Sequence, residues 1–247
     1  MPQYIAFSSC GNDSIALIQF LHECGIKAVT VAYNNTGWAI EWWHTRVEKT
    51  RALCESYGYK FEEIESIGME QLVRDKKGWP MAASKMQFCT DFLKTGPSRL
   101  WLREYDPFGD AICVTGVRRE ESQNRKDHPE HIRDSKYEGR MRWFPLVEMK
   151  EPERDALIRR AGFDILPHGS MECFPCVCSN RSDFRMLSKY PSLIDKIEKI
   201  ETEMGFTRNG KPRTMFRPYR HMGATGIREV VKWGIADRGK YKKESTK

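Results

Sequence analysis

The chain has 247 residues, with 41 Lys and Arg against 34 Asp and Glu and a formal net charge of +7. This length suits one substantial α/β domain with an appendage. No run of about 18 apolar residues occurs, so we expect no membrane-spanning helix. The first residues lack the charged and apolar regions of a signal peptide, and eight cysteines without one favour a reducing, cytoplasmic compartment.

Positive charge gathers towards the C-terminus. Residues 205–247 hold 12 Lys and Arg and 3 Asp and Glu, a net charge of +9, so the rest of the chain carries −2. Such an imbalance favours an anionic partner such as tRNA or DNA. For residues 238–247 alone, a solvated basic tail without a partner is the simpler interpretation.

The first 115 residues predict alternating strands and helices. Strands are expected at residues 4–8, 27–33, 60–64 and 111–115, and helices at 14–24, 40–57, 69–75 and 91–105. Repeated βα units predict an α/β fold with a mostly parallel, twisted sheet and helices on both faces. Ligands of such sheets bind beyond the carboxyl ends of the strands, so the loops after Ser8, Tyr33 and Thr115 should surround the site.

The periodicity weakens after this region. Residues 118–142 are polar and charged, and they predict a long surface loop or lid. Further helices are expected at residues 154–161 and 185–204, the second broken near Pro191. We expect two parts: a nucleotide-binding domain at 1–165 and a cysteine-bearing, basic segment at 166–247 packed on it.

A tight loop of small residues separates the first strand from the first helix. Such a loop directs backbone N–H groups at one point, and the helix N-terminus adds partial positive charge, so both favour a bound phosphate. The alternative is an ordinary strand–turn–helix junction. The residues expected to contact a nucleotide here are Ser8, Ser9, Gly11, Asn12, Asp13 and Ser14.

This loop resembles the Ser-Gly-Gly-x-Asp-Ser signature of PP-loop ATP pyrophosphatases. Cys10 replaces the first glycine, and Asn12 stands where many members have lysine. In that superfamily the loop holds the pyrophosphate end of ATP, and Asp13 and Ser14 can offer oxygens to phosphates or to a metal. The resemblance therefore implies ATP with Mg²⁺ as the ligand.

Further motifs follow in the order of one family within that superfamily. Residues 34–38 resemble its Asp-Thr-Gly motif, residues 89–97 its Cys-x-x-x-Leu-Lys-x-x-Pro motif, and residues 115–122 its Gly-x-Arg-x-x-Glu-Ser motif. A Pro-Leu pair, a helix and a Cys-x-x-Cys motif then close the series. Over residues 4–187 the chain resembles the phosphoadenosine phosphosulfate (PAPS) reductase family, which implies the adenine nucleotide alpha hydrolase-like fold.

These motifs add candidate ligands at the same edge of the sheet. Arginines beyond a strand end can grip phosphate or sulfate oxygens bidentately, and a lysine can act as a point charge. For each charged residue the alternative is a solvated surface charge. The added nucleotide-contacting candidates are Thr36, Gly37, Gly116, Arg118 and Arg119, and the catalytic candidates are Asp13, Ser14, Lys94 and Arg118.

Three cysteines lie within six residues. Cys173, Cys176 and Cys178 form a Cys-x-x-Cys-x-Cys pattern that favours a metal, and the family resemblance implies Cys89 as the fourth ligand. Four thiolates suit a [4Fe–4S] cluster or Zn²⁺, and the resemblance favours iron–sulfur. His168 is an alternative ligand, and three cysteines alone would leave one iron open to carry a sulfide.

The remaining cysteines lie elsewhere in the expected fold. Cys24, Cys54 and Cys113 are expected to pack in the core, and Cys10, in the nucleotide loop, is expected to be reactive.

The catalytic chemistry has three candidate forms. Reductases of this family use a nucleophilic cysteine in a C-terminal motif, but no cysteine follows Cys178 here. Asp13 and Ser14 point instead to ATP, so the first hypothesis is adenylation of a substrate coupled to sulfur transfer, on tRNA or DNA, with a sulfur-donor or partner protein. The alternatives are a PAPS or APS reductase with an external thiol, and a non-catalytic nucleotide-sensing or nucleic-acid-binding partner.

Residues 211–221 interleave arginine with Phe216 and Tyr219. Arginine can pair with backbone phosphates while aromatic rings stack on unpaired bases, with Arg217 and Arg220 as the expected phosphate contacts. A strand that docks a partner protein explains the same pattern.

Overall fold

The computed structural model describes residues 3–82, 86–167, 170–217 and 223–237. The chain forms two compact units, which we call unit 1 (Met1–Ile67 and Asp91–Phe174) and unit 2 (Gly68–Thr90 and Pro175–Lys247). These are units of packing, and the functional division into residues 1–165 and 166–247 stays a prediction.

Unit 1 contains a six-stranded sheet in the order β3-β2-β1-β4-β6-β5. Its strands are β1 (Tyr4–Ser8), β2 (Val29–Asn35), β3 (Lys60–Glu65), β4 (Ile112–Val114), β5 (His131–Arg133) and β6 (Met141–Trp143). Every neighbouring pair is parallel except β5 and β6, which are antiparallel. The predicted mostly parallel sheet is confirmed.

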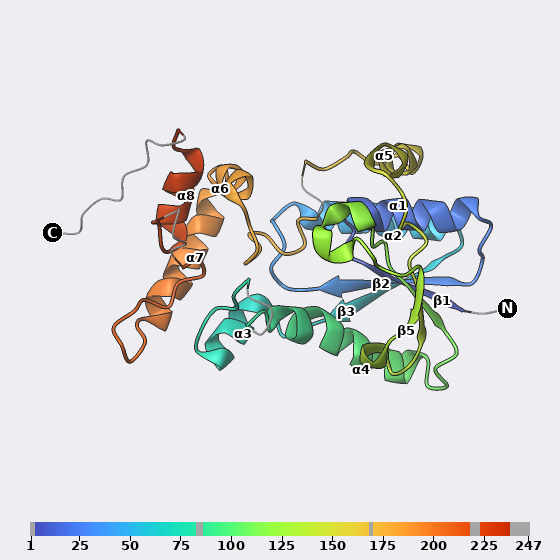
Figure 1. Cartoon of the computed structure of the whole chain (residues 1–247), viewed down its shortest axis with the longest axis horizontal. Coiled ribbons are helices and arrows are strands. Elements are labelled where there is room, and N and C mark those ends of the chain that lie inside the picture. The colour runs from blue at the N-terminus through green and yellow to red at the C-terminus, as the bar shows by residue number, and fades with distance from the viewer. Residues whose placement is uncertain (1–2, 83–85, 168–169, 218–222, 238–247) are drawn as a thin grey trace. The chain divides into compact units, whose positions relative to one another are not determined.

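Helices cover both faces of this sheet (Figure 1). The helices α1 (Asn12–Glu23), α2 (Trp43–Ser56) and α5 (Glu151–Arg160) pack on one face, against Ala6 and other buried residues. The helix α4 (Gly96–Tyr105) packs on the other face, against Ile5 and Phe7. Successive side chains of β1 therefore enter opposite cores, which explains why its central residues are all apolar.

The segment at residues 118–142 is more regular than the long surface loop or lid that its composition predicts. It contains β5 and the start of β6, with 3₁₀ turns at Arg119–Glu121, Gln123–Arg125 and Ser135–Tyr137. Each of these strands has three residues, too few to show an alternating pattern in the sequence.

The helix predicted at residues 91–105 begins with a π-helical turn, Asp91–Thr95, before α4. A Cβ on Gly96 would lie 2.6 Å from the carbonyl oxygen of Asp91, so only glycine fits where the turn brings backbone and backbone together. Short π-helical segments are frequent at functional sites, and Lys94 lies on this one.

Unit 2 is helical. Its helices are α3 (Met69–Lys76), α6 (Arg181–Leu187), α7 (Pro191–Met204) and α8 (Ile227–Ile235). Phe184 packs against Phe216 and Trp233, with ring centroids 4.7 and 6.1 Å away. Pro191 begins α7, where its missing N–H leaves no helical bond unmade, so the predicted break near Pro191 is confirmed.

Among the described residues, no helix combines the length and hydrophobicity that crossing a bilayer requires.

Candidate nucleotide site

The loops after β1, β2 and β4 lie at one edge of the sheet. β1 lies between β2 and β4 in the sheet, with Ser8 opposite Tyr33 and Ala6 opposite Val114. The chain therefore crosses to opposite sides of β1, which creates the switch point where open α/β sheets bind ligands. The structure brings the predicted loops together at this edge.

The loop between β1 and α1 is held by its own side chains. The Oγ of Ser8 accepts the N–H of Cys10 at 2.9 Å, and the Oγ of Ser14 accepts the N–H of Ser9 at 3.1 Å. Cys10 has a φ of 55°, a left-handed conformation in which glycine is usual and in which the family signature has glycine. The side chains of Ser8 and Ser14, two of the three predicted serines, therefore shape the loop.

The backbone of this loop supplies the anion-binding groups. α1 begins at Asn12, and its first intrahelical bond runs from the Ile15 N–H to the Gly11 carbonyl at 3.0 Å. The N–H groups of Asn12, Asp13 and Ser14 come before that bond. The N-cap residue is Gly11, which has no side chain to accept a hydrogen bond from them. Free N–H groups and the positive end of the helix dipole favour a phosphate at this point.

Asn12 uses its side chain inside the protein. Its Nδ2 donates to the Leu166 carbonyl at 2.9 Å, and its Oδ1 accepts the Leu166 N–H at 3.0 Å. Both ends of the amide are paired with one backbone residue, so the side chain ties residue 166 to the loop. The predicted nucleotide contact of Asn12 then rests on its backbone N–H.

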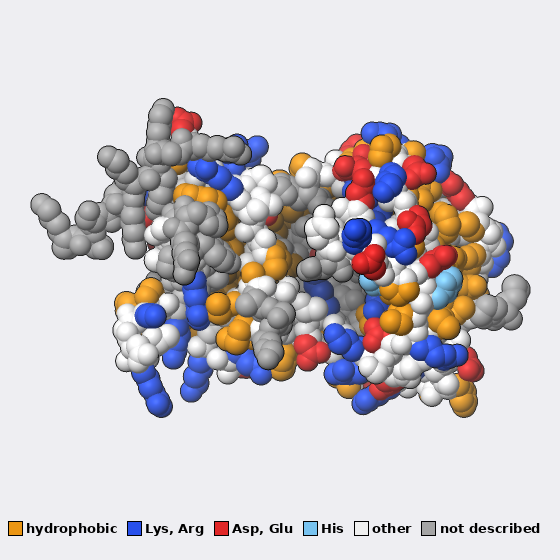
Figure 2. All heavy atoms as spheres, in the orientation of Figure 1, with side chains coloured by type: hydrophobic (Ala, Val, Ile, Leu, Met, Phe, Trp, Pro, Cys, Tyr) orange, Lys and Arg blue, Asp and Glu red, His pale blue; other side chains and the backbone are white. Residues whose placement is uncertain are grey.

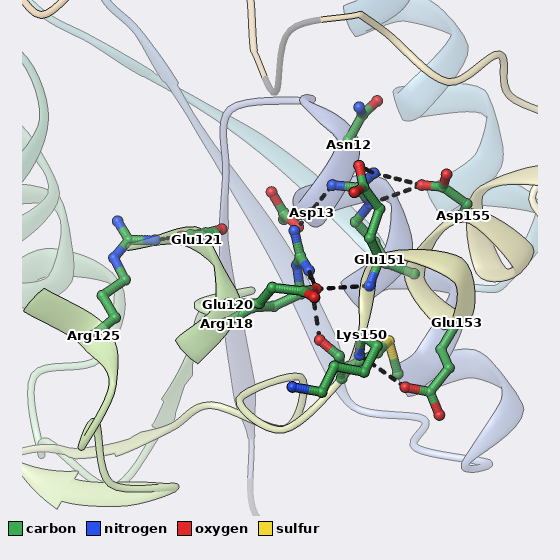
Figure 3. Close-up of polar contacts among 12 residues, drawn as sticks. Asn12, Asp13, Arg118, Glu120, Glu121, Arg125, Lys150, Glu151, Glu153 and Asp155 are labelled. Atoms are coloured by element: carbon green, nitrogen blue, oxygen red, sulfur yellow. Dashed lines mark hydrogen bonds and ion pairs between the residues drawn. The ribbon is translucent and has the colours of Figure 1, made fainter. Parts of the chain in front are cut away.

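Asp13 pairs with a buried arginine. The Nε of Arg118 donates to Oδ1 of Asp13 at 2.6 Å, and its Nη1 lies 3.1 Å from Glu120 (Figure 3). Arg154, on α5, lies 3.9 Å from the same Asp13 oxygen. Arg118 is only 4% exposed, so these carboxylates fix a guanidinium at the switch point.

Gly116 allows the β4 loop to approach α1. A Cβ at Gly116 would lie 2.6 Å from the backbone oxygen of Asp13, closer than carbon and oxygen tolerate. Glycine is thus required by close packing of two backbones. This glycine shapes the site in which it was predicted to contact the nucleotide.

Arg119 is directed away from this pair. Its Nε and Nη2 donate to the carbonyl of His128 at 3.0 and 2.8 Å, and its Nη1 pairs with Glu148. The guanidinium therefore braces the segment before β5. Its predicted phosphate contact stays a prediction that this arrangement does not favour.

The loop after β2 is built around a buried glutamate. Glu172 is fully buried, and it accepts the Tyr33 hydroxyl and the Thr36 N–H, the latter at 2.8 Å. The Thr36 hydroxyl donates to the carbonyl of Glu172 at 2.7 Å, and the Gly37 N–H donates to Asn35 at 2.9 Å. Thr36 and Gly37 therefore lie at the predicted edge, and the Thr36 hydroxyl is already used.

A lysine and a surface hollow lie near this part of the site. Burial is the main cause that raises the pKa of Glu172, and the positive charge of Lys94 opposes the rise. Lys94 thus lies within electrostatic range of Glu172, and its contact with a phosphate stays a prediction. Beside the loop, a hollow of about 320 Å³ is lined by Tyr33, Gly37, His44 and neighbouring residues.

The cysteines of unit 1 are of two kinds. Burial raises the pKa of the Cys10, Cys54 and Cys113 thiols to about 12, so all three are protonated near neutral pH. The prediction of a reactive Cys10 is therefore wrong, because the loop buries its sulfur completely. Cys24 is exposed at the end of α1, so its prediction as a core residue is also wrong.

The four predicted metal ligands fall in different units. Cys173 lies in unit 1, where it pairs with Trp38 in a single β-bridge, whereas Cys89, Cys176 and Cys178 belong to unit 2. The pKa of Cys178 is raised to about 11, mainly by burial and also by the neighbouring Cys176 and Cys89. These three thiols are thus neighbours of the kind that soft metals prefer.

The described cysteines are not arranged around a single metal position. Among the described residues, no three His, Cys, Asp or Glu side chains are placed to hold one metal ion. The donor chemistry therefore fits a cluster but the geometry does not. His168, the alternative ligand, lies outside the described residues.

The basic segment of unit 2 is only partly available to a partner. Phe216 is buried against Phe184, so its predicted stacking on bases is wrong, whereas Arg217 is exposed. Residues 218–222 and 238–247, which include Tyr219, Arg220 and the basic tail, lie outside the described residues. Figure 2 shows other Lys and Arg side chains of unit 2 at its surface.

Three residues at this site were not predicted. Glu172 directly precedes the cysteine pattern, and Arg154 follows the Pro-Leu motif on a predicted helix. Arg46 lies on the apolar stripe of α2 between Trp43 and Thr50, where a charged residue is unexpected. The sequence signal that could have identified Arg46 is a charged residue on the predicted apolar face of this helix.

The chain is an α/β protein with a parallel sheet, an open helix N-terminus and a fixed arginine at its switch point, an arrangement that favours an anion. Residues 3–168 match the phosphoadenosine phosphosulfate reductase domain. The chain belongs to this family, and its fold is the PP-loop α/β fold that the resemblance implied.

Similarity to individual proteins is more distant. A phosphoadenylyl-sulfate reductase from Candida auris, in a phosphate complex, is 16% identical with a TM-score of 0.47, over 67% of this chain and 75% of that one. An NH₃-dependent NAD synthetase from Campylobacter jejuni, with nitrate, is 14% identical with a TM-score of 0.41, over 82% and 83%. No curated protein matches the sequence.

Proposed function

We propose that this protein is an ATP-dependent enzyme that adenylates a substrate and couples this step to sulfur transfer on nucleic acid. The observation that carries the adenylation step is the open N-terminus of α1 beside the buried Arg118 at the switch point. Free N–H groups suit the pyrophosphate end of ATP, and the arginine suits a phosphoryl group whose charge grows during transfer.

In the proposed step, an oxygen of the acceptor attacks the α-phosphorus. A new P–O bond forms to the acceptor, the bond to the bridging oxygen breaks, and pyrophosphate leaves. The N–H groups of Asn12, Asp13 and Ser14 hold the departing pyrophosphate. Arg118, oriented by Asp13 and Glu120, neutralises charge, and Lys94 adds a second cation.

The second step of the proposed reaction is sulfur transfer to the adenylated substrate. Its support is the proximity of the Cys89, Cys176 and Cys178 thiols, a donor set suited to an iron–sulfur cluster, with Zn²⁺ as the alternative. The exposed Arg217 in a segment of net positive charge supports a tRNA or DNA partner.

The test is to identify the products of ATP in the presence of Mg²⁺ and candidate tRNA or DNA acceptors. Release of AMP and pyrophosphate is expected, and Arg118→Gln should lower its rate about 100-fold. Arg103→Gln is the matched control, because Arg103 is a mostly exposed arginine of unit 1 that pairs with Glu138. Cleavage to ADP, or tight ATP binding without turnover on any acceptor, would contradict the proposal.

Family membership favours a second candidate, reduction of a sulfonucleotide with an external thiol as reductant. In that reaction a thiol attacks the sulfur, the S–O bond to the nucleotide phosphate breaks, and the adenine nucleotide leaves. A second thiol then attacks the resulting S-sulfonate, which forms a disulfide and releases sulfite. Thioredoxin-dependent release of sulfite from PAPS or APS would support it, and no release from either would remove it.

A further inference from the structure

Arg46 lies against the backbone of the nucleotide loop. It is on α2, 8% exposed, and its Nε donates to the carbonyl of Cys10 at 2.8 Å. Its Nη1 donates to the carbonyl of Asp164 at 3.2 Å, and its Nη2 is buried without a hydrogen-bond partner among the described residues. A buried guanidinium with an unused donor needs an explanation.

Its charge is balanced differently from that of the other buried arginines in the described chain. Arg118, Arg140 and Arg154 each contact a carboxylate, at 2.6, 2.7 and 2.5 Å. Arg46 makes no ion pair with any described residue, and the carboxylate of Asp164 attracts it only from beyond ion-pair distance.

The surroundings of Arg46 are mostly aromatic. Its guanidinium carbon lies 5.1 Å from the ring centroid of Phe163 and 5.9 Å from that of Trp43. Rings stabilise a cation only partly, and burial lowers the pKa of Arg46 while leaving it charged. A buried cation without a counter-ion is costly, so its position beside an anion-binding loop is informative.

We propose that Arg46 is an electrostatic positioning residue of the nucleotide site, whose buried charge is balanced when phosphate groups occupy the loop. This inference rests on the proposed nucleotide site and adds the source of its charge. Asn12 holds Leu166 where a lysine would offer a cation, and Arg46 supplies a positive charge from behind the loop backbone. It does so without reaching the ligand, because its Nε is bonded to Cys10.

The experiment measures binding of adenosine, AMP, ATP and pyrophosphate by calorimetry to the full chain and to Arg46→Met. Methionine keeps an apolar stem beside Phe163 and removes the charge. We expect ATP and pyrophosphate to bind at least about tenfold more weakly, AMP to lose less, and adenosine to bind unchanged. A purely structural role would weaken adenosine and ATP alike, and that result would overturn the proposal.

Two further variants complete the test. Arg51→Met is the matched control, because Arg51 lies on the same helix but pairs with Glu63 at 3.4 Å. Arg46→Lys keeps the charge and should bind pyrophosphate within about threefold of the unmodified protein. If Arg46→Met does not fold, Arg46→Lys provides the test. A tenfold or greater loss of pyrophosphate affinity in Arg46→Lys, despite the retained charge, overturns the proposal.

The unmodified protein separates the two proposals. If it binds ATP and pyrophosphate, and Arg46→Met binds them equally well, only the role of Arg46 is overturned. If it binds no phosphate-bearing ligand, the proposed function and this inference fail together.

Discussion

The nucleotide loop of unit 1 and the thiol segment of unit 2 hold their reactive groups in different ways. In unit 1, the side chains of Ser14, Asn12 and Asp13 are already paired with protein partners, and the backbone N–H groups remain for a ligand. In unit 2, Cys89, Cys176 and Cys178 are neighbours, but no described trio is arranged around a metal. The fold shapes the first site, whereas the proposed metal at the second would have to draw its thiol ligands together.

If the proposed iron–sulfur cluster is present, we expect it to depend on single thiols. Cys176→Ala should remove nearly all iron and sulfide from anaerobically purified protein, because a cubane loses a ligand that it cannot replace. Cys24→Ala, at an exposed cysteine of unit 1, should retain full iron content. Iron and sulfide analysis with a visible spectrum measures both. Zinc without iron, or equal iron in both variants, would contradict the iron–sulfur proposal.

The same contrast predicts that the nucleotide loop depends on close packing. Gly116→Ala should lower the free energy of unfolding by about 1–3 kcal/mol, because the new methyl meets the Asp13 carbonyl at 2.6 Å. ATP binding should weaken with it. Gly78→Ala, where an added Cβ meets nothing within 4 Å, should change stability by less than about 0.5 kcal/mol. Denaturant unfolding checks both, and similar losses would rule out the packing argument.

A third prediction concerns Glu201, which holds unit 2 together. Its carboxylate accepts the N–H groups of Met215 and Ile227 at 2.8 and 3.0 Å, and burial raises its pKa above the usual 4.5. Glu201→Gln should cost about 1 kcal/mol at low pH, because the amide leaves one N–H without an acceptor.

The pH dependence of this residue follows from the raised pKa. Between pH 4.5 and the folded pKa, the unfolded chain releases the proton that the folded chain retains, so unfolding becomes more favourable as pH rises. The stability of the unmodified protein relative to Glu201→Gln should therefore be highest below pH 4.5 and should fall as pH rises through the folded pKa. Unfolding curves across this range measure it, and a constant difference would show that Glu201 does not titrate as inferred.

The smallest effect is expected at the exposed Arg217. Arg217→Glu should weaken tRNA or DNA binding by about two- to tenfold and reduce the slope of log affinity against log salt by about one or two. Arg103→Glu, at an arginine of unit 1, is the control. Filter binding at several salt concentrations measures both. Unchanged affinity would favour a protein partner for residues 211–221.

The sequence by itself determined the parallel α/β fold, the position of the loop before α1, and the family. These features depend on local patterns: buried strands of five to seven residues, small residues between strand and helix, and motifs in a fixed order. Short strands such as β5 escaped prediction because three residues carry no periodicity.

Only the tertiary structure decided which side chains remain available to a ligand. Asp13 meets Arg118 across 105 residues, and Asn12 meets Leu166 across 154, so no local pattern could predict either pair. The unbalanced charge of Arg46 also emerged only once burial was known, because the same residue on a solvated face would be unremarkable. Burial and long-range pairing fix the electrostatics of this site, and both depend on contacts that a single segment does not contain.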